Sequence, residues 1–500
     1  MQNAWKLSRD AWVDRAVDVL VDFCKPMTRK AIHDSRRRDL QMAGHGRYKP
    51  LDLQPYLGYD NFAAWLMIVE WAWLKTLAKK QIMPKRDAKY LKSEILYDLI
   101  RSITTSDQDL EEAKTRHDII ALTNLMKQHY KSKKFPPQLH KWLHYCATSY
   151  DIISTAYALQ YRLTFDRVIL PKMRQVDTHW RELIATNVDT LQAGRTHLQT
   201  ALPITVGFWA AQLHNRYVRN CRSAAHHANV VEGKFSGACG TSASQVVMMG
   251  DINAEECVLN MLGLAIAPIS TQIAPPESLQ SAYHALVQVS GTLANLGEDG
   301  RILQMSAIQE LRSSSSTSSA MSHKTSNPIA SEQLMGMHRT VVSQFNLLLM
   351  NMVSDLQRDL TGSSCMREYS GILVLVYQQL LTAERWLKNL KIDVERCRIN
   401  LSAEERYLTA EVLHLALGMA GMPDAHHFVN ESIIPITRSC GCSLSEAIEM
   451  YCNSPTNADK SECAEFLKKV PPDIMELLHQ PELYIGKSKQ IAMQELNNIL

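Results

Sequence analysis

The feature that most constrains the fold is a stripe of apolar and small residues between positions 279 and 303. Its members are alternately three and four residues apart: Leu279, Ala282, Leu286, Val289, Leu293, Leu296, Gly300 and Leu303. This alternation is typical of a helix packed lengthwise in a bundle at a shallow crossing angle. The segments 152–185, 201–232 and 335–357 are equally long and apolar at helical spacing. We therefore expect an all-α protein built around a bundle of long helices.

The length of these helices predicts self-association. A helix of about thirty residues spans roughly 45 Å, and one chain cannot bury all faces of several such helices, so we expect a homo-oligomer. Shorter helical patterns flank the bundle on both sides, and we see no internal repeat and no strong strand alternation. We predict an N-terminal extension, an N-terminal helical domain, the bundle and a smaller C-terminal helical domain, at residues 1–45, 46–145, 146–364 and 365–500.

Composition excludes several functional classes. The net charge of +3 is too small to indicate binding to nucleic acid or to an anionic membrane. No apolar run reaches the roughly 18 residues of a spanning helix, and the first residues lack the apolar core of a signal peptide. The eleven cysteines form no C-x-x-C pair. They are more typical of buried thiols in a reducing compartment than of disulfides or a zinc site, which predicts a cytoplasmic protein.

A serine-rich block at residues 313–332 separates two of the helical patterns. It contains a serine run, a methionine, a His-Lys pair and an Asn-Pro pair. Composition alone is consistent with a polar linker. Hydroxyl groups beside a cation also suit a mobile loop that closes over an anion and delivers a nucleophile or base.

Three further polar clusters border the helices. Residues 144–151 could simply cap a helix, or they could bind a carboxylate at its N-terminus. Residues 194–199 hold either a structural histidine or an acid/base beside an anion site. Residues 358–367 read either as a helix end or as a pair of arginines that clamp a phosphate.

Together, and in this order, these blocks resemble the adenylosuccinate lyases of the fumarase/aspartase superfamily. Residues 144–151 are similar to the family's His-Tyr-Gly-x-Thr-Ser-x-Asp, residues 194–197 to its Gly-Arg-Thr-His, and the serine block to its Ser-Ser-x-Met-Pro-x-Lys-x-Asn-Pro loop. Residues 114–118, 237–241 and 271–272 resemble further family motifs. The resemblance covers residues 46–440 and implies a fumarase/aspartase-like helical bundle.

The resemblance also implies a reaction and an assembly. The family eliminates fumarate from adenylosuccinate, giving AMP, and from SAICAR, giving AICAR, in purine biosynthesis. Each active site combines segments from three subunits of a homotetramer, and neither a metal nor an organic cofactor is implied. The alternative is another superfamily lyase, or an enzyme like 3-carboxy-cis,cis-muconate cycloisomerase, with a phosphate-free substrate. An inactive helical scaffold is the third interpretation.

By this resemblance, Ser318 is the base, with Ser319 as its alternative, and His197 is the general acid that Glu332 orients. Further residues would bind the succinyl carboxylates, namely Lys324, Asn327, Thr148 and Ser149. Others would line the pocket, namely His117, His144 and Gln272. The nucleotide end would be held by Arg47, Tyr48, Arg358, Ser363 and Arg367.

Several positions depart from the family pattern. Cys146 and Thr317 stand where the family has glycine, and Ser322 stands where it has proline. The Pro-Pro-Glu segment at 275–277 falls near the family's Arg-Asp pair. Because glycine and proline set loop dihedral angles, these changes bear on the geometry of the site, and they favour the alternative substrate class.

Overall fold

A computed structural model gives the structure of the chain. It describes residues 8–24, 50–129, 135–250, 253–313, 327–357, 361–366, 368–457 and 460–500. Two compact units are present, and each is described by itself. The first unit comprises residues 1–174, 219–294 and 334–382, and the second comprises residues 175–218, 295–333 and 383–500. Helices dominate both units, so the predicted all-α class is confirmed.

The first unit contains the N-terminal helices and parts of the long ones. Its elements are α1 (Ala11–Cys24), η3 (Leu51–Leu53), α3 (Gln54–Leu57), η4 (Tyr59–Asn61), α4 (Phe62–Lys79), α5 (Lys85–Ala88), α6 (Ser93–Ser102), α7 (Thr105–Thr115), α8 (Asp118–Gln128), α9 (Pro137–His140), α10 (Ser149–Thr164), η5 (Phe165–Ile169), β3 (Glu232–Gly233), α13 (Ala243–Met249), α14 (Ala254–Leu262), β4 (Ala265–Ile266) and α17 (Ser363–Met366).

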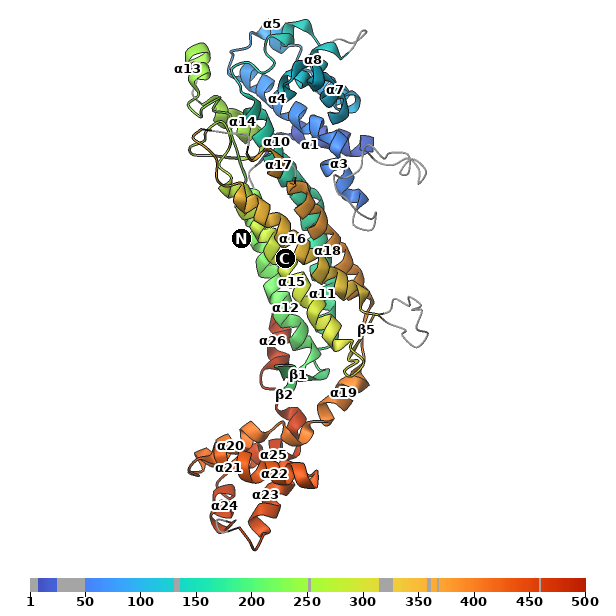
Figure 1. Ribbon diagram of the computed structural model, residues 1–500, viewed down its shortest axis with the longest axis vertical. Helices are drawn as coiled ribbons and strands as arrows, with labels where there is room; N and C mark the ends of the chain where they lie inside the picture. The colour runs from blue at the N-terminus through green and yellow to red at the C-terminus, as the bar shows by residue number, and fades with distance from the viewer. Residues whose placement is uncertain are drawn as a thin grey trace. The chain divides into compact units, whose positions relative to one another are not determined.

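Five long helices each have residues in both units, because the unit boundaries fall within them. They are α11 (Leu170–Thr186), α12 (Val206–Asn229), α15 (Glu277–Leu303), α16 (Ile329–Met350) and α18 (Tyr369–Asn389). The apolar stripe lies on α15, and its central members Leu286, Val289 and Leu293 are fully buried. In the first unit, Ser290 of α15 lies 3.0 Å from Nδ1 of His338 on α16, and Gln379 of α18 donates to the carbonyl of Leu334 on α16 at 2.8 Å. Figure 1 shows α16 and α18 side by side. The predicted bundle helix at 279–303 is confirmed.

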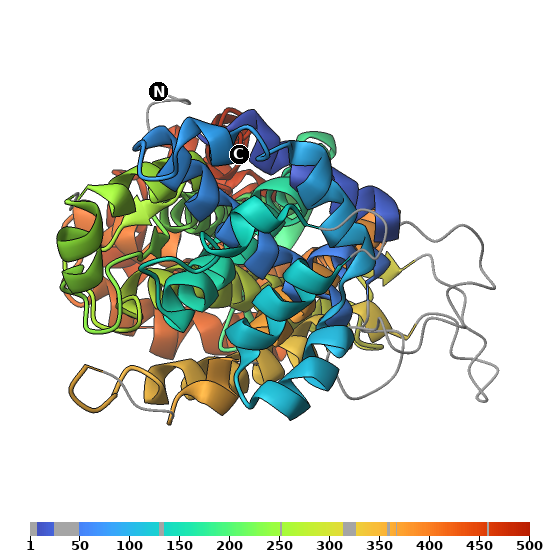
Figure 2. The same ribbon diagram turned by 90° about the horizontal axis from the view of Figure 1, so that it is seen from above.

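Helix α4 forms the centre of the N-terminal part of the first unit. Its residues are buried on nearly every side, including Trp65, Trp71 and Trp73, as expected for a helix that is apolar all round. Helices α6, α10 and α14 pack against it. The blue and cyan helices of this part lie together in Figures 1 and 2. This packing places the start of α10 beside α4.

The remaining elements belong to the second unit. They are β1 (Leu191–Thr196), β2 (Gln199–Thr205), β5 (Leu311–Ser313), β6 (Leu390–Ile392), α19 (Val394–Ser402), η6 (Glu405–Tyr407), α20 (Ala410–Met419), α21 (Ala425–Phe428), η7 (Val429–Ile433), α22 (Ile434–Cys440), α23 (Leu444–Asn453), α24 (Lys460–Leu467), α25 (Pro472–His479), η8 (Pro481–Leu483) and α26 (Ser488–Glu495). Helices α20 to α25 enclose an apolar core of their own around Leu413, Leu417 and Ile433.

The predicted helix at 201–232 begins five residues late, because residues 191–205 form an antiparallel hairpin. A short apolar run fits a strand as well as a helix, so periodicity alone did not distinguish them. Gly207 lies in the first turn of α12, where the helix packs so closely on the preceding chain that an added Cβ would lie 2.9 Å from the carbonyl oxygen of Asn187. The predicted domain boundaries stay predictions, since the two units divide the long helices instead.

Among the described helices, none combines the length and the apolar character that crossing a membrane requires. From Cys146 onward, the cysteines that the structure describes are free thiols.

Candidate active site

The residues before α10 follow an unusual backbone path. His144 and Cys146 both have left-handed conformations, with φ of 58° and 56°. Glycine adopts this region at no steric cost, which explains why the related motif has glycine at the position of Cys146. The indole N–H of Trp73 donates to the carbonyl of Tyr145 at 2.7 Å and holds the bend against α4. The left-handed turn is therefore kept although the glycine is absent.

The N-terminus of α10 presents two hydroxyl groups beside a histidine. His117 caps α8 by accepting the amide N–H of Ile120 at its Nδ1 (3.3 Å). Its Nε2 therefore carries the ring proton and donates to Ser149 Oγ at 3.2 Å. Ser149 thus uses its oxygen as an acceptor and keeps its own O–H for another partner.

Thr148 is arranged in the same way. Gln272 Nε2 lies 3.5 Å from Thr148 Oγ1 and donates to it, and Thr148 is the N-cap of α10. The O–H of Thr148 is then available as a donor beside that of Ser149. Four residues that the sequence predicted as substrate ligands, from segments far apart in the chain, meet at one helix N-terminus. Such a terminus attracts anions because its amides and dipole favour negative charge.

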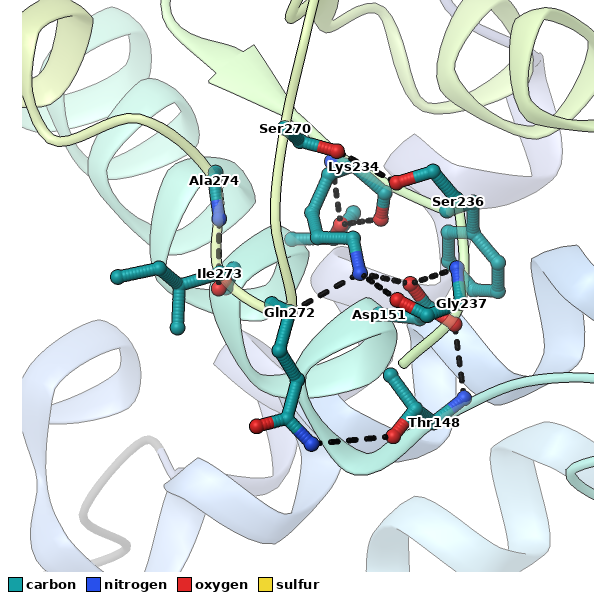
Figure 3. Close-up of polar contacts among 12 residues, drawn as sticks. Thr148, Asp151, Lys234, Ser236, Gly237, Ser270, Gln272, Ile273 and Ala274 are labelled. Atoms are coloured by element: carbon teal, nitrogen blue, oxygen red, sulfur yellow. Dashed lines mark hydrogen bonds and ion pairs between the residues drawn. The ribbon is translucent and has the colours of Figure 1, made fainter. Parts of the chain in front are cut away.

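A buried ion pair fastens these segments together, as Figure 3 shows. Lys234 Nζ lies 2.6 Å from Asp151 Oδ1, and both side chains are fully buried. The same ammonium donates to the carbonyls of Gly237 (2.7 Å) and Gln272 (3.1 Å). The amides of Thr148 and Gly237 donate to Asp151. Burial raises the pKa of the Asp151 carboxyl, while Lys234 and these amides oppose the rise.

The turn at 237–241 fits tightly against the segment that carries Gln272. At Gly240, φ is +77° and an added Cβ would lie 1.9 Å from the carbonyl oxygen of Ser270. Only glycine fits there. Ser236 and Ser270 share a hydrogen bond of 2.5 Å across the same contact.

His144, also predicted as a pocket residue, pairs with a carboxylate. Its Nδ1 lies 2.8 Å from Glu70 Oε1, and its amide N–H donates to Oε2 at 3.2 Å. Burial lowers the pKa of His144, but the hydrogen bond and charge of Glu70, with Asp151 and Asp118, raise it above its usual value.

Ser363, predicted at the nucleotide end, belongs to α17 and borders two clefts of the first unit. In one cleft it lies with Asp118, Tyr150 and Tyr157. In the other it lies with Tyr150 and the Pro275–Pro276 segment. Both clefts therefore reach the first turn of α10, next to Thr148 and Ser149.

In the second unit, His197 occupies the tip of the β1–β2 hairpin. It and Leu198 form a two-residue turn with φ of 53° and 63°, a geometry in which glycine and asparagine are preferred. Both side chains are exposed. Non-glycine residues in this conformation often mark functional sites.

Arg195, two positions before His197, is held in an ion pair. Its guanidinium makes two hydrogen bonds to the buried carboxylate of Glu310, at 2.5 and 3.1 Å. Gln192 and Asn400 donate to the same carboxylate at 2.8 and 2.9 Å. Arg195 therefore fixes the hairpin to the chain around Glu310, and the anion site expected in this cluster stays a prediction.

Glu332 lies in the first turn of α16 and is exposed, and Asn327 precedes that helix. Among the described residues, neither His197 nor Glu332 makes a hydrogen bond or an ion pair with another side chain, so the orienting role of Glu332 stays a prediction. The other predicted site residues lie outside the described ranges: Arg47, Tyr48, Ser318, Ser319, Lys324, Arg358 and Arg367. The described ranges contain no group of three or more His, Cys, Asp or Glu side chains suited to a metal ion.

Sequence reasoning missed three charged residues that hold predicted site residues within their own unit: Glu70 and Lys234 in the first, and Glu310 in the second. Glu70 did carry a signal, since it is a lone carboxylate in the apolar run 62–74. Such a residue requires a partner once it is buried. Lys234 and Glu310 have no comparable local signal.

Comparison with known proteins assigns the class. The profile of a family described as "Lyase" matches residues 60–343, more than half of the chain, and the chain belongs to this lyase family. It is 27% identical over 456 residues to the adenylosuccinate lyase of Archaeoglobus fulgidus, covering 89% of this chain and 95% of that one. It is 28% identical over 369 residues to the adenylosuccinate lyase of Bacillus subtilis, covering 73% and 81%.

Solved structures share the fold. A fumarate lyase from Mesorhizobium sp. BNC1 superimposes with a TM-score of 0.74 at 22% identity, covering 91% of this chain and 99% of that one. A 3-carboxy-cis,cis-muconate lactonizing enzyme from Pseudomonas putida superimposes with a TM-score of 0.70 at 20% identity, covering 88% and 94%. The fumarase/aspartase-like fold predicted from the sequence is confirmed.

Proposed function

We propose that this lyase cleaves adenylosuccinate to AMP and fumarate, and SAICAR to AICAR and fumarate. The observation that carries the proposal is the pair of hydroxyls at the start of α10. Thr148 and Ser149 accept hydrogen bonds from Gln272 and His117, and so both keep a hydrogen for an anionic ligand. The succinyl group of these substrates has two carboxylates, which suit such donors. Relatives that span nearly the whole chain bear the name adenylosuccinate lyase.

The proposed chemistry is a β-elimination. A base on the serine block, Ser318 or Ser319, takes the proton from the carbon beside a succinyl carboxylate. The electrons of that C–H bond form the new C=C bond of fumarate, and the C–N bond breaks with its electron pair on nitrogen. His197 delivers a proton to that nitrogen. The intermediate is dianionic at the carboxylate, so donors placed in advance lower its energy.

Several predicted ligands complete this proposal. Lys324 and Asn327 would join Thr148 and Ser149 at the succinyl carboxylates. The phosphate would be held by Ser363 with Arg47, Tyr48, Arg358 and Arg367. No metal or organic cofactor enters any step.

We further infer that the enzyme acts as a homotetramer with shared sites. The support is His197 itself, an exposed side chain in a strained turn that has no side-chain partner among the described residues of its own chain. Strain of this kind persists where function requires the conformation. A histidine held in this way is suited to complete a site on a second subunit.

The test is turnover of adenylosuccinate by the purified protein, followed by the release of AMP and fumarate. Ser318→Ala and His197→Asn should each abolish release; asparagine tolerates the left-handed turn, so only the imidazole is lost. Leu198→Asn, at the neighbouring turn position, is the matched control and should retain activity. A folded tetramer that releases no fumarate would refute the purine assignment and direct the search to phosphate-free substrates, muconates among them.

A further inference from the structure

Glu70 is the one charged residue within the apolar stretch 62–74 of α4. Its side chain is completely buried, and the residues on either side, Val69 and Trp71, are buried as well. Placing a carboxylate in such surroundings is costly unless it is hydrogen-bonded and paired. A leucine or methionine would pack there at no such cost. The presence of Glu70 therefore requires an explanation other than core packing.

Both carboxylate oxygens of Glu70 are used by one residue. Oε1 lies 2.8 Å from His144 Nδ1, and Oε2 accepts the His144 amide N–H at 3.2 Å. Because Nδ1 faces a carboxylate oxygen, it carries a proton. The second nitrogen, Nε2, has no hydrogen bond to another described residue, and the side chain is 24% exposed. The left-handed backbone at His144, with φ of 58°, keeps the residue in this orientation.

We propose that Glu70 is a positioning residue that holds His144 as an imidazolium cation, whose Nε2–H binds an anionic oxygen of the substrate. This inference rests on the proposed function, since it concerns how the same site binds its substrate. The anionic oxygen belongs either to a carboxylate or to a phosphate. The two share their chemistry, and the experiment below separates them.

The surroundings of His144 favour the cation. The charged groups that face it are Glu70 on α4, Asp118 on α8 and Asp151 on α10, all acidic. Burial lowers the pKa of His144, while Glu70 and the two aspartates raise it above the usual value of an imidazole. Asp151 is already paired with Lys234, so the dominant favourable contact is Glu70. A cation here complements the neutral hydroxyl donors of Thr148 and Ser149.

The first measurement needs no ligand. Diethyl pyrocarbonate modifies only neutral imidazole, so the pH dependence of modification at His144, followed by peptide mass spectrometry, reports its charge. We expect half-maximal modification at a pH above about 6.5, which is the ordinary pKa of a histidine side chain. In Glu70→Gln, which keeps the volume but removes the charge, the midpoint should fall by about one pH unit or more. Glu70→Asp should restore part of the difference. A wild-type midpoint at or below 6.5 would overturn the proposal, even if the variants did not fold.

The second measurement is calorimetric titration of the tetramer with AMP and, separately, with fumarate. Glu70→Gln should weaken one of them about tenfold at neutral pH, which corresponds to about one pKa unit. Weaker fumarate binding assigns a carboxylate to His144, and weaker AMP binding assigns the phosphate. Unchanged binding of both would refute the contact.

A matched control removes charge from a second buried His–carboxylate pair. His214 Nε2 lies 2.9 Å from Asp177 Oδ1 in the second unit. Asp177→Asn should leave both titrations and the His144 midpoint unchanged. His214 keeps its second carboxylate partner, Glu495, at 2.7 Å. A wild-type protein that binds neither AMP nor fumarate would refute the proposed function, whereas the modification midpoint would still test the charge of His144.

Discussion

Replacing Lys234 by methionine should loosen the start of α10. The substitution keeps an unbranched side chain, one atom shorter, but removes donors to Asp151 (2.6 Å), Gly237 (2.7 Å) and Gln272 (3.1 Å). Removing one partner of a buried ion pair typically costs about 3–5 kcal/mol. The carbonyls of Gly237 and Gln272 lose the same ammonium donor, so we include their loss in this free-energy cost and do not add it separately. We therefore expect local stability to fall by about 4 kcal/mol.

Hydrogen exchange measures this loss where it occurs. The amides of Thr148 and Gly237 donate to Asp151 and so report directly on the pair. Every 1.4 kcal/mol is about a factor of ten, so exchange in peptides containing these amides should accelerate by roughly a thousandfold. Lys468→Met is the control: its partner Glu465 is exposed, and exchange at the site should not change.

A double variant separates charge from packing. Lys234→Met with Asp151→Leu removes both charges, so no isolated carboxylate stays buried. It should recover part of the protection, but not all of it, because the amides of Thr148 and Gly237 lose their acceptor. If hydrogen exchange in Lys234→Met alone is as slow as in wild type, the Lys234–Asp151 pair does not hold the site segments together.

Three further predictions concern other parts of the chain. Gly240→Ala should prevent stable folding, since its Cβ would lie 1.9 Å from a backbone carbonyl oxygen, whereas Gly237→Ala, with the same φ of +77° and open space, should cost about 1–2 kcal/mol by thermal unfolding. An oxidant such as diamide should join Cys452 and Cys463, whose sulfurs lie 3.4 Å apart; burial raises the pKa of Cys463 to about 12, so the disulfide should form faster in alkaline solution, with the loss of two hydrogens seen by mass spectrometry. Because the pKa of His144 is raised on folding, its pairing with Glu70 stabilises the protein fully below the usual histidine pKa, and this contribution is lost as pH rises through the raised pKa. The difference in melting temperature between wild type and Glu70→Gln should therefore shrink as pH increases.

Much of the fold was predictable from local patterns. The alternation at 279–303 corresponds to α15, because a period of three and four residues places one apolar face along a helix whatever lies beside it. The polar run at 144–151 contains Thr148, the N-cap of α10, for a similarly local reason: Asp151 accepts the amide of Thr148 three residues away.

The hairpin at 191–205 shows where local pattern was insufficient. Its strands are short and apolar, and they resemble the start of the following helix until their pairing is known. Arg195 and His197 are two residues apart in one motif, yet their side chains have different surroundings in the structure. Arg195 is tied to Glu310, and His197 is exposed at the turn.

By itself, the sequence determined the helical class, the main bundle helix and the family motifs, because these depend on spacing along the chain. Tertiary structure alone decided which charges meet. Glu70 and His144 are 74 positions apart, and Arg195 and Glu310 are 115 apart. No periodicity relates such residues. Burial makes each of these charges costly without its partner, so the pairing is decided only when the helices and loops that carry the two groups pack together.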